Sequence, residues 1–205
     1  MFFGHLAAGM AAKRIAPEAP LGALLVSGTA IDTLWGVFSI AGIEAPAVAV
    51  GEAKTIAWSH GLPMAVVWAL VGCAIAYLFT RNRRTSIVIG CVVFSHWVLD
   101  FVSLAPLLPL AFEGSLTVGL GLYSSMVVAV IADLGLLALG IAIYLQMTKP
   151  KDRIGIWSFW LMLLFVVLLA VPAAIPQLSL LPVLAIVLLL PFGNWVDRHR
   201  SLIAA

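Results

Sequence analysis

The sequence predicts an all-α integral membrane protein, a single helical bundle of about six transmembrane helices preceded by a short N-terminal helix. Of its 205 residues, 63% are hydrophobic and only 10% are charged, whereas soluble domains carry roughly 25% charged residues. Six apolar segments are long enough to cross the hydrocarbon core of a bilayer, which needs about 20 helical residues. This composition excludes a soluble globular protein.

The first apolar segment, Phe2–Ala12, is too short to span a membrane, because about 11 residues at 1.5 Å each reach only halfway across the core. Its basic pair, Lys13 and Arg14, follows the apolar stretch, which is the reverse of a secretory signal. We therefore expect the segment to stay in the mature protein. It would either lie flat at the interface or enter the membrane as a re-entrant half-helix that carries His5 inward.

The remaining apolar segments follow one another along the chain within one membrane domain, residues 1–205. The predicted spans are Leu21–Ile43, Ile56–Phe79, Ser86–Leu104, Leu120–Gln146, Ile154–Val171 and Leu178–Val196. We expect residues 1–147 to form the bundle that holds the functional site. Residues 148–205 are expected to form a C-terminal helical hairpin and a cytoplasmic tail, in which His199 is solvated.

The basic residues predict the orientation, because Lys and Arg concentrate in cytoplasmic loops. Ten of the 11 fall on one side of the predicted spans if both termini are cytoplasmic, and only Lys54 falls outside. The acidic Glu44, Glu52 and Glu113 lie in the outward connections. We therefore expect a multi-pass protein of the inner cell membrane whose partner is the lipid bilayer.

Several function classes are excluded or disfavoured by the rest of the composition. A formal charge of +2 gives no dense basic face for nucleic acid. The two cysteines, Cys73 and Cys91, cannot form a disulfide framework or a cysteine-based zinc cluster. Both lie in apolar runs, where a free cysteine packs as a small hydrophobic residue.

Ionisable side chains inside the predicted spans are the main functional signal. Each costs at least about 2.5–3.5 kcal/mol on insertion scales, so it needs a partner, a water-filled cavity or a bound ion. All of them fall in the first four spans, and they are Asp32, His60, His96, Asp100 and Asp133. Their concentration predicts one interior cluster.

His96 and Asp100 are spaced i, i+4, so both side chains share one face of a helix. Such a face can hold a metal, relay a proton or form a neutralised pair between helices. Two donors fall short of a zinc site, so Asp32 and His60 are the candidate third and fourth ligands, with His5 as a fifth if the N-terminal segment is re-entrant.

Each of these residues also has a purely structural interpretation. A single intramembrane histidine, His60 or His96, can be a satisfied packing residue, and His5 can be interfacial. Asp133 can bond a neighbouring helix instead of serving a site. The irregular sequence around Gly61 and Pro63 suggests a distorted start of the second span, which is tolerated at depth only beside protein or a water-filled cavity.

The order of these residues resembles a known family. The stretches GHLAAG, SGTAIDTLWG, WSHGLPMAVVWAL and VFSHWVLDFVS are similar to the bacterial and archaeal membrane-bound metal-dependent hydrolases, also described as LexA-binding inner-membrane-associated hydrolases and distantly similar to zinc-dependent phospholipase C. The resemblance covers about residues 2–147. It implies that the metal ligands are His5, Asp32, His60, His96 and Asp100.

Three functions remain open from the sequence. A divalent metal, with zinc expected, would activate a water for hydrolysis of a phosphoester or lipid-type substrate, and Asp133 or Asp32, whichever the metal leaves free, would be the general base. The cluster could instead carry protons or metal ions across the membrane. It could also only fix helix register in a noncatalytic scaffold.

Overall fold

The computed structural model describes residues 1–44, 56–112, 114–173 and 186–203 and confirms the all-α prediction. The α-helices are α1 (Phe2–Ala12), α2 (Leu21–Gly28), α3 (Ala30–Ile40), α4 (Ala57–His60), α5 (Leu62–Thr80), α6 (Arg83–Ser103), α7 (Met126–Met147), α8 (Arg153–Ala173) and α10 (Leu189–Arg198). The short 3₁₀ helices are η2 (Leu122–Ser124) and η4 (Ile186–Leu188). The strands are β1 (Leu108–Pro109), β2 (Thr117–Val118), β3 (Thr148–Pro150) and β4 (Arg200–Leu202), paired antiparallel as β1 with β2 and β3 with β4.

Four of the described helices, α5 to α8, are long and apolar enough to cross a membrane. The first predicted span is a bent pair, α2 and α3, whose axes differ by 59° at a break beside Gly28, and it counts as a fifth span if it crosses as one unit. The second predicted span is also interrupted, since Gly61 separates α4 from α5. The sixth predicted span lies partly outside the described residues, which include only its end as η4 and α10.

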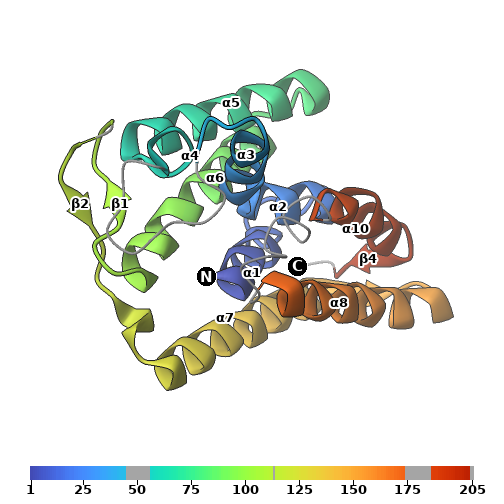
Figure 1. Cartoon of the computed structure of the whole chain (residues 1–205). Helices are drawn as coiled ribbons and strands as arrows, with labels where there is room; N and C mark the ends of the chain where they lie inside the picture. The colour runs from blue at the N-terminus through green and yellow to red at the C-terminus, as the bar shows by residue number, and fades with distance from the viewer. Residues whose placement is uncertain (45–55, 113, 174–185, 204–205) are drawn as a thin grey trace.

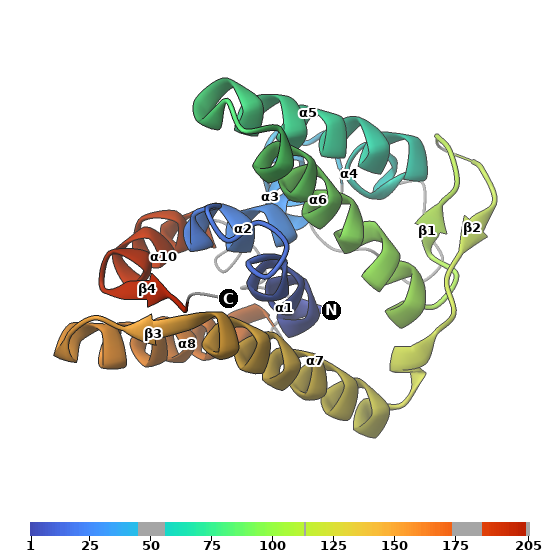
Figure 2. The same ribbon diagram turned by 180° about the vertical axis from the view of Figure 1, so that it is seen from behind.

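Helix α1 lies at the centre of the molecule, between α7 on one side and α2 and α6 on the other (Figures 1 and 2). Its side chains His5, Leu6 and Met10 are almost fully buried. Of the two placements expected for this segment, the structure therefore favours the re-entrant one, in which the half-helix is enclosed by spanning helices. An 11-residue helix is long enough for this position because it does not have to reach both surfaces.

Small residues allow the neighbours of α1 to approach it closely, as in other membrane helix pairs. A Cβ atom on Gly9 would lie 2.5 Å from the carbonyl oxygen of Leu24 in α2, and one on Gly140 of α7 would lie 2.7 Å from Cα of Ala7. On both sides, α1 therefore approaches the neighbouring helix to backbone contact distance. Only glycine at these two positions permits so close an approach.

The C-terminal region differs from the solvated tail that the sequence predicts. Arg200 is buried and donates hydrogen bonds to the carbonyl oxygens of Thr148 and Gly155, and His199 Nδ1 lies 2.8 Å from a carboxylate oxygen of Asp152. A hydropathy pattern does not reveal that Arg200 finds acceptors and aromatic ring faces within the fold, whereas the side chain of His199 is 24% exposed.

The helix ends that carry basic residues gather at one end of the molecule. The C-terminal ends of α5 and α7 and the N-terminal end of α8 lie at the right of Figure 1, whereas α4, β1 and β2 lie at the left. At the basic end, Lys13 is buried, and its Nζ donates to Asp197 at 2.8 Å and to the carbonyl oxygen of Ala19 at 2.7 Å. This pair ties the turn after α1 to the C-terminal end of α10.

Candidate metal centre

The five ligands expected from the sequence meet in one cluster, although they come from four different helices. His5 lies on α1, Asp32 on α3, His60 on α4, and His96 and Asp100 on α6. Within the cluster, the Nε2 atoms of His60 and His96 each face one oxygen of both carboxylates. These four nitrogen–oxygen distances are 3.5 Å (His60–Asp32), 3.6 Å (His60–Asp100), 3.5 Å (His96–Asp32) and 3.3 Å (His96–Asp100).

Helix α6 supplies two ligands because its i, i+4 pair points to the interior, as the spacing predicts. His96 is fully buried and Asp100 is 3% exposed. Their burial fits the position of α6, whose inward face packs against α1, α2 and α3. The cluster therefore uses the most enclosed of the spanning helices for two of its donors.

The break between α2 and α3 serves the cluster in two ways. It places Asp32 in the first turn of α3, where the positive end of the helix dipole stabilises a carboxylate. It also turns the carbonyl oxygen of Gly28 toward the His96 ring, whose Nδ1 lies 2.8 Å away. A carbonyl oxygen only accepts, so Nδ1 of His96 carries a proton, and in the neutral ring Nε2 then presents its lone pair to the carboxylates.

His60 enters the cluster from α4, a helix of four residues. The chain then turns at Gly61, whose extended backbone starts α5 in a new direction. A Cβ atom on Gly61 would lie 2.4 Å from the carbonyl oxygen of Ala57, so the turn depends on glycine. The irregular start expected for the second span is thus the feature that brings His60 inward.

His5 reaches Asp100 from the opposite side. Its Nε2 lies 3.2 Å from Asp100 Oδ1, an oxygen that the Met1 amino group approaches at 3.5 Å, and its ring stacks on that of His96 with 3.6 Å between centroids. The backbone N–H groups of Phe3 and Gly4 donate to the Asp133 carboxylate at 3.2 and 2.7 Å. Asp133 therefore caps the N-terminus of α1 and bears on the cluster through the placement of His5.

The donor set could hold a divalent metal ion. Two groups of three side chains each bring their ligand atoms within 4.8 Å of one another. One group is His5, Asp32 and His96, and the other is His60, His96 and Asp100. The contacts of 3.3–3.6 Å are longer than the 2.7–3.2 Å of N–H···O hydrogen bonds. Four ligands held at about 2.0–2.1 Å around a tetrahedral ion are separated by about 3.3–3.4 Å.

The Nε2 atom of His96 gives the most direct indication of a missing partner. It is buried and has no hydrogen-bond partner among the described residues. A buried imidazole nitrogen with a lone pair and no donor nearby costs free energy. Two carboxylates beside it in an apolar bundle add a charge that must be neutralised. A cation at this point would satisfy both requirements.

Access to the cluster differs among its members. The Asp32 side chain is 34% exposed, whereas those of His5, His60, His96 and Asp100 are at most 8% exposed. An incoming molecule therefore meets Asp32 first. The other four donors form the enclosed base of the site.

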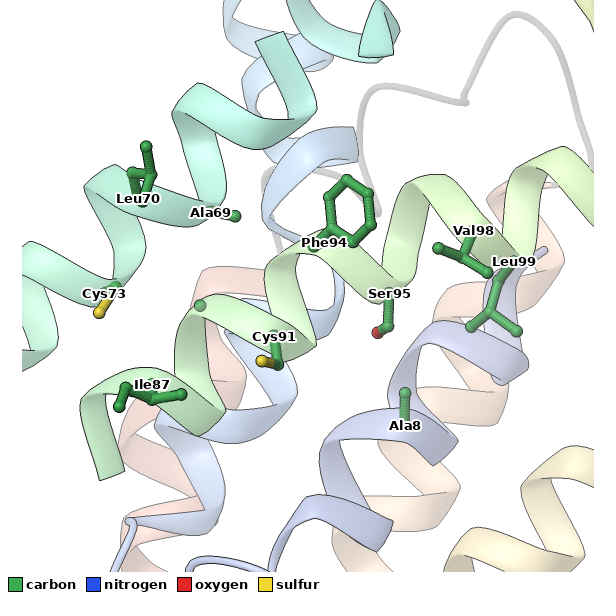
Figure 3. Close-up of a pocket in the computed structure, with 11 residues that line it drawn as sticks. Ala8, Ala69, Leu70, Cys73, Ile87, Cys91, Phe94, Ser95, Val98 and Leu99 are labelled. Atoms are coloured by element: carbon green, nitrogen blue, oxygen red, sulfur yellow. The ribbon is translucent and has the colours of Figure 1, made fainter. Parts of the chain in front are cut away.

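A separate pocket of about 610 Å³ lies on a different face of α6, between this helix, α5 and α1 (Figure 3). Its lining is almost wholly apolar, and the one hydroxyl group, that of Ser95, donates to the carbonyl oxygen of Val92. None of the five cluster residues lines it. It lacks the convergent polar groups of a catalytic pocket.

Sequence reasoning missed two contributors to the cluster. Gly28 supplies a carbonyl oxygen that no side-chain pattern reveals, although the sequence Ser27-Gly28-Thr29 is a recognisable helix interruption. Glu44 was expected in an outward loop, yet it is buried and bonds Ser59, the residue beside His60. Glu52, Glu113 and Lys54, assigned to the same outward side, lie outside the described residues.

No protein-family model, curated protein or solved structure proved detectably similar to this chain.

Proposed function

We propose that the protein is a membrane-embedded metal-dependent hydrolase whose His/Asp cluster binds one divalent cation, with zinc as the expected ion. The observation that carries the proposal is the buried Nε2 atom of His96, which has no hydrogen-bond partner among the described residues and has two carboxylates within 3.5 Å. Imidazole nitrogen and carboxylate oxygen are the ligand types of catalytic zinc sites. The family resemblance of residues 2–147 supports the same assignment.

The geometry favours one ion over two. Both groups of three donors include His96, and its Nδ1 is already bonded to Gly28. Only Nε2 is free to bind, so the two groups describe alternative positions around one nitrogen. We therefore expect a stoichiometry of one ion per chain.

A bound divalent ion would supply Lewis-acid activation of water. His60, His96 and Asp100 are the enclosed donors that would hold the ion, and His5 contacts the second oxygen of Asp100 through Nε2. Asp32 faces the opening and is placed to orient or deprotonate a water. Asp133 is a positioning residue in this scheme, because its carboxylate is engaged by the start of α1.

The substrate class that we propose is a phosphoester of a membrane lipid or a lipid-linked phosphate. Two members of the cluster lie on α4 (His60) and near the C-terminal end of α6 (Asp100), and α4 lies at the side of the molecule opposite the basic helix ends (Figure 1). With those basic ends in the cytoplasm, as the distribution of Lys and Arg favours, the protein is a multi-pass inner-membrane protein with both termini inside. The site then lies nearer the outer leaflet.

Turnover of phospholipid vesicles by the detergent-purified protein tests the hydrolase proposal. We expect release of phosphate-containing headgroups from phosphatidylglycerol or phosphatidylethanolamine vesicles, loss of that activity with a chelator and recovery with Zn²⁺. Asp100→Asn should abolish turnover, whereas His199→Gln, a histidine change outside the cluster, should not. A wild-type protein that binds metal but hydrolyses neither these lipids nor a soluble phosphodiester would overturn the hydrolase assignment.

Ion transport is the second candidate, and one observation favours it. The helices beside the cluster are interrupted at Gly28 and at Gly61, and broken helices mark ion sites in transporters. Zn²⁺ flux into proteoliposomes that depends on Asp100, without lipid turnover, would favour transport over hydrolysis.

A further inference from the structure

Glu44 is a buried carboxylate that the sequence assigns to no function. It follows α3, and only 5% of the residue is exposed. Its Oε1 accepts hydrogen bonds from the backbone N–H groups of Trp58 and Ser59 at 2.8 and 2.9 Å, and its Oε2 accepts from the Ser59 hydroxyl at 2.6 Å. Three donated bonds are what an ionised carboxylate accepts.

The direction of these bonds determines which nitrogen of His60 carries the proton. The Ser59 hydroxyl has one proton and gives it to Glu44. Its oxygen also lies 2.8 Å from Nδ1 of His60, so it can only accept there. Nδ1 of His60 therefore carries a proton, and in the neutral ring Nε2 presents its lone pair to Asp32 and Asp100.

The same arrangement holds His96, whose Nδ1 donates to Gly28. The difference is that the partner of His96 is backbone, whereas that of His60 is a side-chain pair that substitution can change. Helix α4 has only four residues, so it does not fix the His60 ring by itself. Glu44 anchors α4 through two of its N–H groups and orients the ring through Ser59.

We propose that Glu44 and Ser59 are positioning residues that hold His60 in the tautomer able to bind a metal, so that the cluster is ready for the ion before it arrives. The inference rests on the proposed metal site. Partners of this kind, behind a ligand histidine, typically change metal affinity by 10- to 100-fold when they are removed.

Glu44→Gln gives the sharpest test because it reverses the direction of the hydrogen bond between this side chain and the Ser59 hydroxyl. The shape of the side chain hardly changes. The amide oxygen can still accept from Trp58 and Ser59, but the amide NH₂ then faces the Ser59 oxygen and donates to it. The Ser59 proton is left to point at Nδ1 of His60, which moves the ring proton to Nε2. We expect Zn²⁺ affinity to fall by about 10- to 100-fold.

Serine variants separate this effect from a general loss of structure. Ser59→Ala removes the link without imposing the wrong tautomer, so we expect a smaller loss than in Glu44→Gln. Ser59→Thr keeps the hydroxyl and should bind close to wild type. Glu18→Gln and Ser95→Ala are matched controls, since Glu18 is exposed and bonds Asn82, and Ser95 lies in the apolar pocket.

Two readouts apply to each detergent-purified variant. Competition with a chromophoric chelator gives the Zn²⁺ affinity, and ¹⁵N chemical shifts of labelled histidine in the metal-free protein give the His60 tautomer. The proposal expects an Nδ1–H ring in wild type and an Nε2–H ring in Glu44→Gln. If wild type binds no Zn²⁺, the proposed function fails. The His60 tautomer in the metal-free protein still tests whether Glu44 and Ser59 orient the His60 ring. Unchanged Zn²⁺ affinity together with an unchanged tautomer in Glu44→Gln would overturn the inference.

Discussion

At the scale of single residues, the two nitrogens of His96 have separate tasks. Nδ1 donates to a backbone carbonyl oxygen at 2.8 Å, and in the neutral ring Nε2 is then an acceptor with no hydrogen-bond partner in the described part of the chain. His60 repeats the pattern through Ser59 and Glu44. Two imidazole lone pairs thus face the same two carboxylates, Asp32 and Asp100. With neutral rings, a bound cation would stabilise these lone pairs and the two carboxylate charges together.

Substitution of Asp133 distinguishes a structural role for this residue, at the start of α1, from a catalytic role as general base. Asp133→Ala leaves the N–H groups of Phe3 and Gly4 without their acceptor, so we expect a loss of about 1–3 kcal/mol in unfolding free energy. Denaturant titration in detergent measures it, and Asp133→Asn should lose less because an amide oxygen still accepts. Unchanged stability combined with abolished turnover would show instead the direct catalytic role that the sequence suggests.

The ligand residues could be predicted from the sequence because an ionisable side chain in an apolar span is expensive wherever the span lies. Asp32, His60, His96 and Asp100 stand out for that reason alone. Glu44 could not be predicted in the same way. It lies at the end of an apolar span next to a polar connection, and its burial depends on how α4 folds back over it.

At the scale of elements, interrupted helices and close glycine contacts shape the cluster. Hydropathy predicts residues 21–43 as one span, and the structure bends this segment by 59°. The interruption could have been suspected from Ser27-Gly28-Thr29, but its angle follows from packing against α1 and α6. At the break, a Cβ atom on Gly28 would lie 2.2 Å from the carbonyl oxygen of His5.

Gly28→Ala is therefore expected to push α1 away and to displace His5. Overpacking of this kind costs about 1–3 kcal/mol, so we expect a lower melting temperature and weaker Zn²⁺ binding. Gly135→Ala in α7 is the matched control. Its Cβ would meet nothing within 4 Å, and alanine favours a helix by about 1 kcal/mol over glycine. Equal effects of the two variants on melting temperature would contradict this packing.

At the scale of the whole molecule, the two ends of the bundle differ in chemistry. One end gathers the basic residues and is closed by the β3–β4 pair and by the bond between Lys13 and Asp197. The other carries α4 and the β1–β2 pair, on the side of the cluster (Figure 1). The positions of Lys and Arg in the sequence are enough to predict this difference between the two ends. The positive-inside rule depends on the basic residues of the loops and not on how the helices pack.

Lys13→Met tests the closure at the basic end. The change removes the cation from Asp197 and a buried bond to Ala19. We expect a loss of about 1.5–3 kcal/mol, the range for hydrogen bonds to charged groups, measured by unfolding in detergent. The neighbouring Arg14 is exposed, so Arg14→Met should change stability by less than about 0.5 kcal/mol. Similar losses in both variants would argue against a specific closure.

Cysteine labelling in intact cells tests the orientation. In a background without Cys73 and Cys91, a membrane-impermeant maleimide should label Phe112→Cys, beside the β1–β2 pair, because that position is exposed and is expected outside. Arg84→Cys, at an exposed position in the first turn of α6, should be labelled only after the membrane is permeabilised. The reverse pattern would invert the orientation and place the cluster near the inner leaflet.

The central claim is that the five-residue cluster binds one divalent metal ion, and elemental analysis of freshly detergent-purified protein tests it most directly. We predict close to one zinc per chain in wild type and in His199→Gln, and loss of that metal in His96→Gln and in Asp100→Asn when both variants elute as folded protein in size-exclusion chromatography. Wild-type protein without stoichiometric metal, and unable to take up added Zn²⁺, would contradict the account.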